Sequence, residues 1–451
     1  MADPVILWLR QDLRLHDQAA LYAAAQEGAV IPVYVLDDEA PGPWRIGAAQ
    51  RWWLHHGLTA LDAALRKRGS RLILRRGDAV ATLRALAAET GAASIHAIRH
   101  YEPWWREAEE ALGDRLTLHD GNHLVPPEEL TTGSGGQYRM FAPFWRALSV
   151  RMPPTEPLPP PSRIAAPALW PASENLADWN LLPTSPDWAG GFDEWSPGEE
   201  GARIALEEIR GIVGDYAVDR DRPAVQGTSR LSPHLHFGEV SARQVWHALD
   251  RAEQGGEAFL RELAWRDFTR GVLMALPDYG RRNGRPRFDA MPWRTAPRDL
   301  AAWQQGRTGY PIVDAGMRQL WATGWMHNRV RMIVASFLVK HLLIDWRAGE
   351  RWFWDTLVDA DYGNNAVNWQ WVAGTGVDSN MFGRIMAPLA QSAKFDAGDY
   401  IRRWVPELAG LSDEAIHDPD AAGCRPDGYP AKIVGHREGR ERALAAQAKL
   451  K

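Results

Sequence analysis

The 451-residue chain is predicted to fold into two domains of different class, an α/β domain followed by an all-helical domain. Over residues 1–130, short β-branched runs alternate with Ala/Leu-rich stretches, which is typical of a parallel sheet covered by helices on both faces. From 196 to 451 apolar residues recur at helical spacing, and no strand pattern of comparable strength intervenes. The segment between these patterns, 131–195, is predicted to be a long proline-rich connector.

Five apolar runs in the first domain are predicted strands, and four stretches between them are predicted helices. The strands cover 5–9, 29–37, 71–75, 94–98 and 115–119, and the helices cover 17–27, 48–68, 80–90 and 102–112. A helix joins each pair of consecutive strands, so the strands are expected to run parallel. The usual glycine-rich fingerprints of dinucleotide and P-loop sites, G-x-G-x-x-G and G-x-x-x-x-G-K-[S/T], are absent.

The connector holds ten of the chain's 31 prolines between residues 153 and 186. Proline lacks an N–H and clashes with the preceding helical turn, so this stretch is not a regular helix or a central strand. We expect it to run over the surface between the two domains.

The second domain is predicted to consist mainly of helices. They cover 199–211, 241–253, 257–276, 311–324, 327–345 and 349–359. The chain has 23 tryptophans, more than its 11 phenylalanines and 10 tyrosines together. Such use of a large, flat side chain indicates heavy helix packing, ligands that stack on indole rings, or both.

The composition excludes several classes of protein. A single cysteine, Cys424, excludes an intramolecular disulfide framework and a cysteine-based metal centre, and fits a reducing cytoplasm. The N-terminal residues lack the pattern of a secretory signal, and the longest apolar run, 332–339, is too short to cross a bilayer. We therefore expect a cytoplasmic protein with no membrane partner. The net charge of −5 excludes a uniformly basic surface but not a local basic patch.

The segment GTSRLSPHLHFG, residues 227–238, places three hydroxyl side chains and an arginine just before a predicted helix. Such groups form an anion site that suits a pyrophosphate. The alternative is ordinary helix capping with an arginine in solvent, and for this segment taken alone it is the better interpretation.

The segment FLRELAWRDF, residues 259–268, places Glu262, Trp265 and Arg266 on one helix face, since their spacing is i, i+3 and i+4. This set suits a stacked and hydrogen-bonded base or flavin, and a surface Glu–Arg pair is the plainer alternative. Between 261 and 290, seven arginines and four acids give a local charge of +3. A locally positive surface suggests a phosphate-bearing partner, and an ordinary solvated charged face is the alternative.

Two segments nearer the C-terminus add polar groups. Asn328 opens an otherwise apolar helix, and polar groups there are costly to bury unless they bind something. Asp359, Asp361 and Asn365 cluster ahead of two tryptophans. A calcium loop that starts at Asp359 would need glutamate at its twelfth position, where the chain has Gln370, so no metal site is predicted.

Together and in this order, the motifs resemble the photolyase/cryptochrome family, and within it the class I-type cyclobutane pyrimidine dimer photolyases of bacteria. The matching segments are WLRQDLRLHD, DYAVDRDRPAVQGTSRLSPHLHFG, RELAWRDFTR, GYPIVDAGMRQLWATGWMHNRVRM, SFLVKHLLIDWR, DADYGNNAVNWQW and KFDAGDYIRRWVPEL. The resemblance covers nearly the whole chain and is thin only in the connector. It implies a Rossmann-like α/β domain and a helical domain that holds FAD in a folded conformation.

The resemblance also implies roles for individual residues. The residues that would hold FAD are Tyr216, Thr228, Ser229, Arg230, Leu231, Ser232, Arg266, Asn328, Arg331, Asp359, Asp361 and Asn365. The residues that would meet the flipped lesion and its DNA strand are Arg220, Glu262, Trp265, Arg329, Met332, Trp371, Arg384 and Gln391. Glu262 and Asn328 would hydrogen-bond the lesion and the flavin as charge develops. Trp369, Trp346 and Trp293 would carry an electron to photoexcited oxidised flavin.

The implied function is light-dependent DNA repair. Reduced anionic FAD would donate an electron to a pyrimidine dimer in UV-damaged DNA, and the electron would return after the cyclobutane ring opens. A cryptochrome-type blue-light receptor is one alternative, disfavoured because only about 43 residues follow residue 408. A (6-4) photolyase is another, disfavoured because that group carries a second histidine where this chain has Asn328.

A second, light-harvesting chromophore is left open by the sequence. The resemblance implies a folate, a deazaflavin or no pigment, close to His100, Tyr101 and Glu102. Trp104 and Trp105 are bulky enough to fill that space instead. A monomer with no obligate protein partner is expected.

Overall fold

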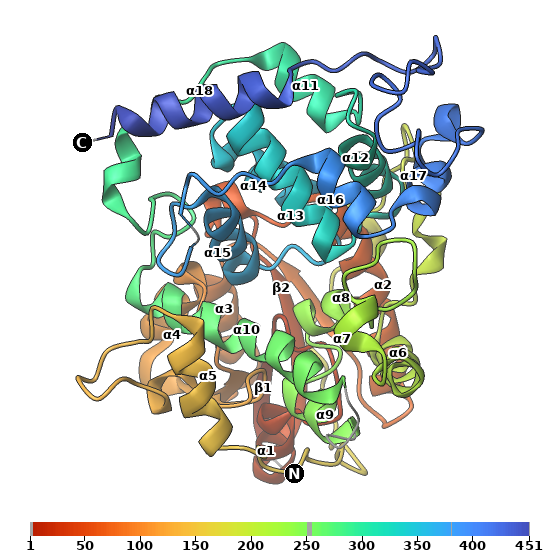
Figure 1. Ribbon diagram of the computed structural model, residues 1–451. Helices are drawn as coiled ribbons and strands as arrows, with labels where there is room; N and C mark the ends of the chain where they lie inside the picture. The colour runs from red at the N-terminus through yellow and green to blue at the C-terminus, as the bar shows by residue number, and fades with distance from the viewer. Residues whose placement is uncertain (1–2, 250–254, 380, 451) are drawn as a thin grey trace.

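The computed structural model describes residues 3–249, 255–379 and 381–450. Its N-terminal part is a five-stranded parallel sheet in the order β3-β2-β1-β4-β5, with helices on both faces (Figure 1). The strands are β1 (Pro4–Leu9), β2 (Ala29–Leu36), β3 (Ile73–Arg76), β4 (Ser94–Ile98) and β5 (Leu116–His119), and the helices are α1 (Ala19–Glu27), α2 (Ala48–Arg66), α3 (Ala79–Thr90) and α4 (Pro103–Leu112). The predicted parallel sheet is confirmed.

Alternate side chains of each strand point to opposite faces of the sheet, and each face has its own core. In β1, Val5 and Leu7 pack with α1 and α2, whereas Ile6 and Trp8 pack with α3 and α4. Both faces are apolar because both are covered, which explains why the strands appear in the sequence as continuous apolar runs.

The connector packs against the α/β domain more closely than the sequence indicates. It begins with a helix, α5 (Phe141–Val150), which the sequence analysis did not anticipate. Farther along, the N–H of Val30 donates to the carbonyl of Ala165 at 2.9 Å, and Trp179 and Phe192 are buried in the core beside α2. The proline-rich stretch is irregular apart from short 3-10 turns, but Trp179 belongs to the core and the stretch does not lie wholly on the surface.

The remainder of the described chain is helical, as predicted (Figure 1). The helices are α6 (Glu199–Ile212), α7 (Tyr216–Asp219), α8 (Ser232–His236), α9 (Ala242–Ala248), α10 (Gly256–Ala275), α11 (Pro297–Gln304), α12 (Pro311–Thr323), α13 (Asn328–Ser336), α14 (Trp346–Thr356), α15 (Tyr362–Ala373), α16 (Pro388–Lys394), α17 (Gly398–Trp404) and α18 (His436–Ala448).

Two predicted helices differ from the structure. The helix predicted for 327–345 is α13 followed by a π-helical turn at Phe337–His341, and α14 then begins at Trp346. The helix predicted for 241–253 ends at Ala248, and the last part of that prediction, 250–254, falls outside the described residues. The domain boundaries at 130 and 195 stay a prediction.

Buried polar contacts hold the helical domain against the sheet. Nη1 of Arg14 donates to the carbonyl of Gly238 at 2.8 Å. The buried carboxylate of Asp17 accepts the hydroxyl of Ser241 at 2.5 Å and Nη2 of Arg243 at 2.7 Å. Charged hydrogen bonds between buried groups are strong and directional, so they fix α8 and α9 relative to the sheet.

Candidate functional site

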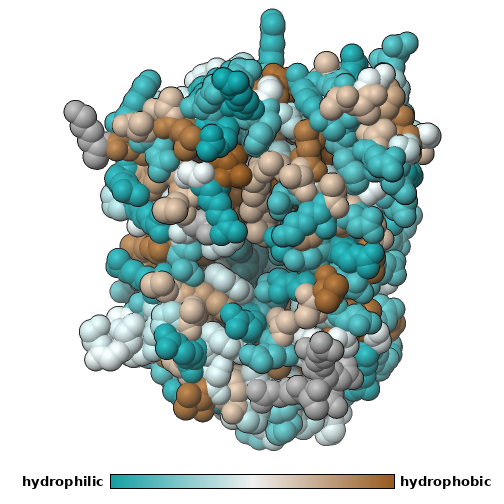
Figure 2. Space-filling view, in the orientation of Figure 1, coloured by the Kyte–Doolittle hydropathy of each residue, from teal (hydrophilic) through white to brown (hydrophobic). Residues whose placement is uncertain are grey.

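A cavity of about 540 Å³ opens between α8, α10, α13 and α15. Figure 2 shows this face of the molecule hollowed near its centre, with hydrophilic residues around the opening. The predicted site residues that line the cavity are Tyr216, Arg220, Thr228, Ser229, Arg230, Leu231, Ser232, Glu262, Trp265, Arg266, Asn328, Arg329, Arg331, Met332, Asp359, Asp361, Asn365, Trp369 and Trp371. The fold thus brings motifs from distant parts of the sequence to one place.

A second hollow of about 430 Å³ adjoins the cavity. Both are lined by Arg329, Met332 and Trp371, and the second adds the predicted DNA contacts Arg384 and Gln391. The predicted DNA-binding residues therefore form a continuous surface that leads into the cavity.

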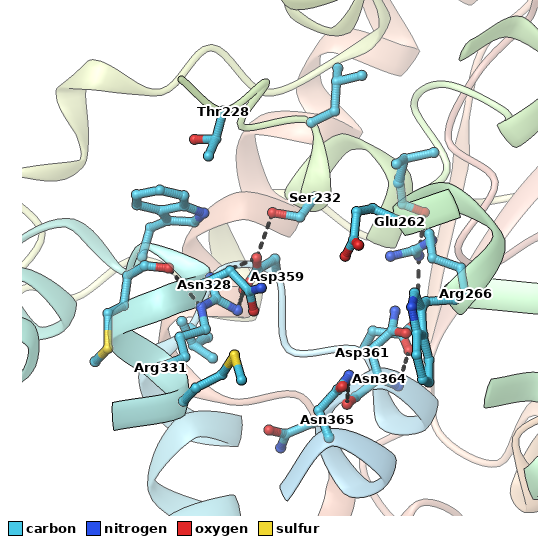
Figure 3. A pocket seen from close by; sticks show the side chains of 18 of the residues that line it. Thr228, Ser232, Glu262, Arg266, Asn328, Arg331, Asp359, Asp361, Asn364 and Asn365 are labelled. Carbon is cyan, nitrogen blue, oxygen red and sulfur yellow. Dashed lines mark hydrogen bonds and ion pairs between the residues drawn. The ribbon is translucent and has the colours of Figure 1, made fainter. Parts of the chain in front are cut away.

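One wall of the cavity is centred on Asp359. The hydroxyl of Ser232 donates to Asp359 Oδ2 at 2.6 Å, and Arg331 donates to both carboxylate oxygens, at 3.1 and 2.9 Å. This bidentate geometry is strong and keeps the guanidinium at a fixed angle. Figure 3 shows Asp359 and Arg331 on one side of the cavity, facing Glu262 across it.

The other wall is centred on Asp361, which caps α15 by accepting the N–H of Asn364 at 2.8 Å. Its carboxylate pairs with Arg270 and lies 3.5 Å from Nη2 of Arg266. Burial alone would raise the pKa of Asp361, but the charges of Arg270 and Arg266, with the ring of His236 3.9 Å away, hold it well below its usual range. Asp361 therefore stays ionised and fixes two guanidinium groups.

Arg230 lines the cavity, but the connector holds its charged end. Nη2 of Arg230 pairs with Glu194 at 2.8 Å, and its guanidinium carbon lies 3.9 Å from the ring centroid of Trp195. The guanidinium does not depend on a ligand for a partner. The role that the resemblance implies for Arg230, holding a phosphate, stays a prediction.

Asn365 is oriented by a residue that the sequence analysis missed, Glu350. The amide Nδ2 of Asn365 donates to the backbone carbonyl and to Oε1 of Glu350, at 3.1 and 3.0 Å. Trp44 of the α/β domain donates its indole N–H to the same Oε1 at 3.3 Å. Since both amide hydrogens of Asn365 are committed, its Oδ1 is the group left to accept a donor from a ligand.

Glu350 is buried, and burial raises its pKa to about 7. It lies one turn after Trp346 and one turn before Trp354 on the buried face of α14. An acid at an apolar position of an amphipathic helix is the sequence signal that identifies such a residue.

Two acids at the mouth of the cavity pair with predicted substrate-binding arginines. Arg220 Nη1 lies 2.7 Å from Glu262 Oε1, and the neighbouring Asp221 pairs with Arg329. All four side chains are partly exposed, so a ligand with hydrogen-bonding groups has access to them. Glu262 and Arg220 thereby present an acceptor and a donor side by side.

Asn328 is the first residue of α13 and is exposed towards the cavity, with Met332 one turn later. The preceding His327 accepts the N–H of Arg329 through Nδ1 at 3.2 Å. Burial lowers the pKa of His327 to about 4, so the ring is neutral near pH 7 and retains this acceptor. The helix start, and with it Asn328, is held in place.

Several residues that line the cavity were not predicted. They are Leu235, Phe259, Leu263, Trp325, Met326, Ala335, Phe353, Leu357, Ala360, Asn364, Asn368 and Val372. Most are apolar, and from sequence alone an apolar residue that faces a cavity has the same pattern as one that faces the core.

The three tryptophans of the predicted electron relay are only partly brought together. The ring of Trp369 lies against Gly349 of α14, so closely that a Cβ there would clash with it, and Trp346 is less than one turn away on the same helix. Trp293 packs against Phe382, with ring centroids 6.4 Å apart. In the described part of the chain no ring contact joins Trp346 to Trp369 or to Trp293, so the relay stays a prediction.

The groups that line the cavity fit a flavin dinucleotide. The hydroxyls of Thr228 and Ser229 suit a pyrophosphate, and the Oδ1 of Asn365 suits a ring N–H. The hydroxyl hydrogen of Ser232 is already donated to Asp359, so its predicted contact with FAD stays a prediction. The indole N–H of Trp369, buried at the cavity wall, has no partner within the described chain. Buried donors normally have an acceptor, so a polar ligand in this cavity satisfies what the protein leaves open.

Two family models match the chain. Residues 5–162 match DNA photolyase, and residues 259–449 match the FAD binding domain of DNA photolyase. A curated protein of Agrobacterium fabrum named deoxyribodipyrimidine photo-lyase is 50% identical, over 99% of this chain and 98% of its own length. The chain belongs to the photolyase/cryptochrome family. Its helical domain is an FAD-binding domain, as the sequence predicted.

Two further comparisons locate the chain within the photolyase/cryptochrome family. The crystal structure of a bacterial class III photolyase from Agrobacterium tumefaciens superposes with a TM-score of 0.95 at 48% identity, covering 100% of this chain and 98% of that one. Cryptochrome-1 of Arabidopsis thaliana is 38% identical, over 99% of this chain but 70% of its own length. The chain is thus more similar to these photolyases than to that cryptochrome.

The residues that the resemblance places near a second chromophore contact neighbouring protein side chains. The ring of His100 lies 4.7 Å from that of Trp105, and Oε1 of Glu102 lies 3.3 Å from Nη1 of Arg270. Tyr101 is buried, and its hydroxyl donates to Glu128 at 2.8 Å. These contacts give each of the three side chains a protein neighbour, and the presence of a pigment beside them stays an open prediction.

A different cavity, of about 320 Å³, lies between the two domains. It is lined by Pro43, Trp44, Arg45, Ile46, Gly47, Gly280, Arg281, Arg347, Glu350, Arg351, Trp354 and Asp355. Two indoles and four arginines give it the chemistry of a site for a flat, anionic ligand. Sequence reasoning did not indicate this cavity, because its two sides are far apart in the chain.

Among residues 3–249, 255–379 and 381–450, no group of three or more histidine, cysteine, aspartate or glutamate side chains is arranged to hold a metal ion. No helix in the same residues combines the length and the apolarity that a membrane crossing needs.

Proposed function

We propose that this protein is a deoxyribodipyrimidine photo-lyase that splits cyclobutane pyrimidine dimers in UV-damaged DNA under blue or near-UV light. The observation that carries the proposal is the cavity itself, in which Glu262, Trp265, Asn328 and Trp371 adjoin the groups that fit FAD. A basic groove with Arg384 leads to it. Full-length similarity to deoxyribodipyrimidine photo-lyase supports the same reaction.

When bound in its reduced form, FAD supplies the photoexcited electron, and the protein contributes position and electrostatics. Trp265 and Trp371 offer flat apolar faces to a pyrimidine dimer flipped out of the duplex, and flipping costs less for damaged bases than for intact ones. Glu262 accepts hydrogen bonds from the N–H groups of the lesion. Arg220, whose Nη1 lies 2.7 Å from Glu262 Oε1, presents a positive charge to the lesion at the same place. Asn328 donates its amide hydrogens to oxygens on which negative charge develops.

The repair reaction is tested by illuminating the reduced protein with an oligonucleotide that carries one thymine dimer. We expect light-dependent loss of the dimer and none in the dark. Glu262→Ala removes the acceptor and leaves the FAD-binding residues in place, so it is expected to lower dimer splitting while the flavin content is unchanged. A reduced, flavin-loaded protein that leaves the dimer intact under illumination would contradict the proposal.

We also propose that Trp369, Trp346 and Trp293 form the route by which oxidised flavin is photoreduced. Trp369 at the cavity wall and the partly buried Trp293 are the ends of this route, with Trp346 on α14 between them in the order of transfer. Trp369→Phe is expected to stop photoreduction while chemically reduced protein still repairs the dimer. Trp8→Phe, in the core of the α/β domain, is the matched control and leaves photoreduction unchanged.

Within the photolyases, we propose the class III subgroup for this chain, whereas the sequence resemblance was to class I. The support is the TM-score of 0.95 and 48% identity to the class III photolyase structure. We further propose that the protein acts as a monomer in the cytoplasm. Light scattering during size-exclusion chromatography tests the monomer, which predicts the mass of one chain, 50.5 kDa.

We propose the interdomain cavity beside Trp44 as the site of a second chromophore. Its indoles suit a flat ring and its arginines suit a carboxylate tail, which favours a folate over a deazaflavin. An absorption spectrum of the purified protein tests for the pigment. Trp44→Ala is expected to remove an absorption band that is not flavin and to leave the FAD bands, and an unchanged spectrum would contradict the assignment.

A further inference from the structure

We propose that Phe141, the first residue of α5 in the connector, is a positioning residue that fixes the plane of Trp265 for the bound lesion. This inference rests on the proposed function, in which Trp265 contacts the substrate. Phe141 does not line the cavity. It lies behind the residue that does.

Phe141 covers one face of the Trp265 ring. The two ring centroids are 3.9 Å apart and the planes differ by 4°, which is a full face-to-face stack. Phe268 meets Trp265 with its edge, at 5.3 Å and 89°. Trp265 is itself only partly buried, since its remaining surface belongs to the cavity wall. Two protein rings thus determine the tilt of the surface offered to a base.

The backbone of Phe141 is held in turn by a carboxylate in the loop after α15. Its backbone N–H donates to Oδ2 of Asp378 at 2.9 Å. Asp378 lies in the loop after α15, the helix that carries Trp371. The connector is therefore tied to the loop that follows α15, the helix that carries Trp371.

The stack extends away from the cavity along α5. The ring of Trp145, one turn after Phe141, is inclined by 15° to it at a centroid distance of 6.5 Å, and the guanidinium of Arg261 lies within 6 Å of both rings. A layer of this kind resists rotation of its innermost member. Without it, an indole at a cavity wall is free to turn about two torsions, and a base that stacks on it must restrict that freedom.

The test is a double-mutant cycle on dark binding of an oligonucleotide with one thymine dimer, measured by anisotropy with the flavin-loaded protein. Phe141→Leu keeps an apolar side chain but removes the stack, and we expect about 2- to 10-fold weaker binding, the range for one aromatic pair. In a Trp265→Leu background the same change is expected to have no further effect, because Phe141 acts through Trp265. Phe141→Tyr keeps a ring and is expected to restore wild-type binding.

Phe192→Leu is the matched control. Phe192 is a buried phenylalanine of the same connector whose ring packs on Trp52 and Trp188 in the core beside α2 and makes no ring contact with Phe141, Phe268 or Trp265 among the described residues. It is expected to lower the midpoint of urea unfolding as much as Phe141→Leu does and to leave dimer binding unchanged. Binding of the undamaged oligonucleotide stays unchanged in both variants.

The outcomes separate this inference from the proposed function. If wild-type protein binds the dimer no more tightly than undamaged DNA and does not repair it, the proposed function fails. If wild type binds and repairs the dimer but the effects of Phe141→Leu and Trp265→Leu add, Phe141 does not act through Trp265 and the inference is overturned. Equal losses of dimer binding for Phe141→Leu and Phe192→Leu overturn it as well.

Discussion

Two regions of the molecule carry dense sets of charged side chains, and they differ in whether those charges surround empty space. At the carboxyl edge of the sheet, Arg10 pairs with Glu109 at 2.7 Å, and His100 lies 3.9 Å from Asp12. These four side chains are buried and close on one another. Around the cavity of the helical domain the ion pairs stand at the walls and leave the centre open.

The comparison shows that buried charged groups can either pair with one another at a sheet edge or line an open cavity. The strand order reverses between β1 and β4, and open α/β sheets bind ligands in the crevice at such a point. Here Arg10 pairs with Glu109 at that edge, and His100 lies beside Asp12. Glu102 at this edge lies 3.3 Å from Arg270, which pairs with Asp361 at the cavity wall. The sheet edge thus serves as a support for the helical site.

The largest effect is expected at Arg270, which joins the two regions. Arg270→Ala leaves the carboxylates of Glu102 and Asp361 buried without their shared partner, and breaking such a pair is expected to lower the free energy of unfolding by about 3–5 kcal/mol. Urea unfolding measures it. Arg66→Ala removes an exposed i,i+4 partner of Asp62 and is the control, with an expected change below about 0.5 kcal/mol. Similar losses in the two variants would contradict a shared buried network.

The next effect concerns Glu350, between the main cavity and the interdomain cavity. Burial raises its pKa from 4.5 to about 7, so between these values the folded protein keeps a proton that the unfolded chain releases. Stability from this group is therefore present at low pH and falls as pH rises through that window, by about 3 kcal/mol in total. Glu350→Gln cannot titrate and is expected to remove that part of the pH dependence.

Urea unfolding at several pH values between 4.5 and 8 compares wild type with Glu350→Gln. The difference in unfolding free energy is expected to shift in favour of the variant as pH rises. Asp62→Asn, at a partly exposed position of α2, is the control and has no such trend. A pH-independent difference for Glu350→Gln would place the titration elsewhere.

Two serines that each donate to a buried aspartate distinguish ligand binding at the open cavity from stability where the domains meet. Ser232 donates to Asp359 at the cavity wall, whereas Ser241 donates to Asp17 where the domains meet. Ser232→Ala is expected to weaken FAD binding by about 1–2 kcal/mol, since the carboxylate loses a hydrogen bond that orients it. Ser241→Ala is expected to lower stability by a similar amount and to leave the Kd of FAD unchanged. Flavin fluorescence titration and urea unfolding measure the two.

The smallest effect is expected at Lys394, an exposed cation beside the groove that contains Arg384. Lys394→Ala removes one contact to a phosphate, and it is expected to weaken binding to damaged and undamaged DNA equally. The slope of log affinity against log salt concentration should fall by about 1. A variant that loses affinity only for damaged DNA would assign Lys394 to lesion recognition instead.

The sequence determined the class of each domain and most of the polar residues around the cavity. Alternating strands and helices identify the parallel sheet because each element has its own periodicity, and local periodicity survives in any tertiary context. The motifs around Ser232, Glu262, Asn328 and Asp361 identify the cavity because each is a short segment with its chemistry in one place. The helix α5, Glu350 and the interdomain cavity were not found this way.

Only the tertiary structure decided which polar groups pair with one another and which remain available to a ligand. Glu102 and Asp361 are both acids in polar segments, yet Glu102 pairs with Arg270 at the sheet edge and Asp361 lines the open cavity. Phe141 stacks on a tryptophan far along the chain, and Trp44 meets Glu350 across the domain boundary. Such contacts depend on where distant elements are packed, and no local pattern of residue types encodes that distance.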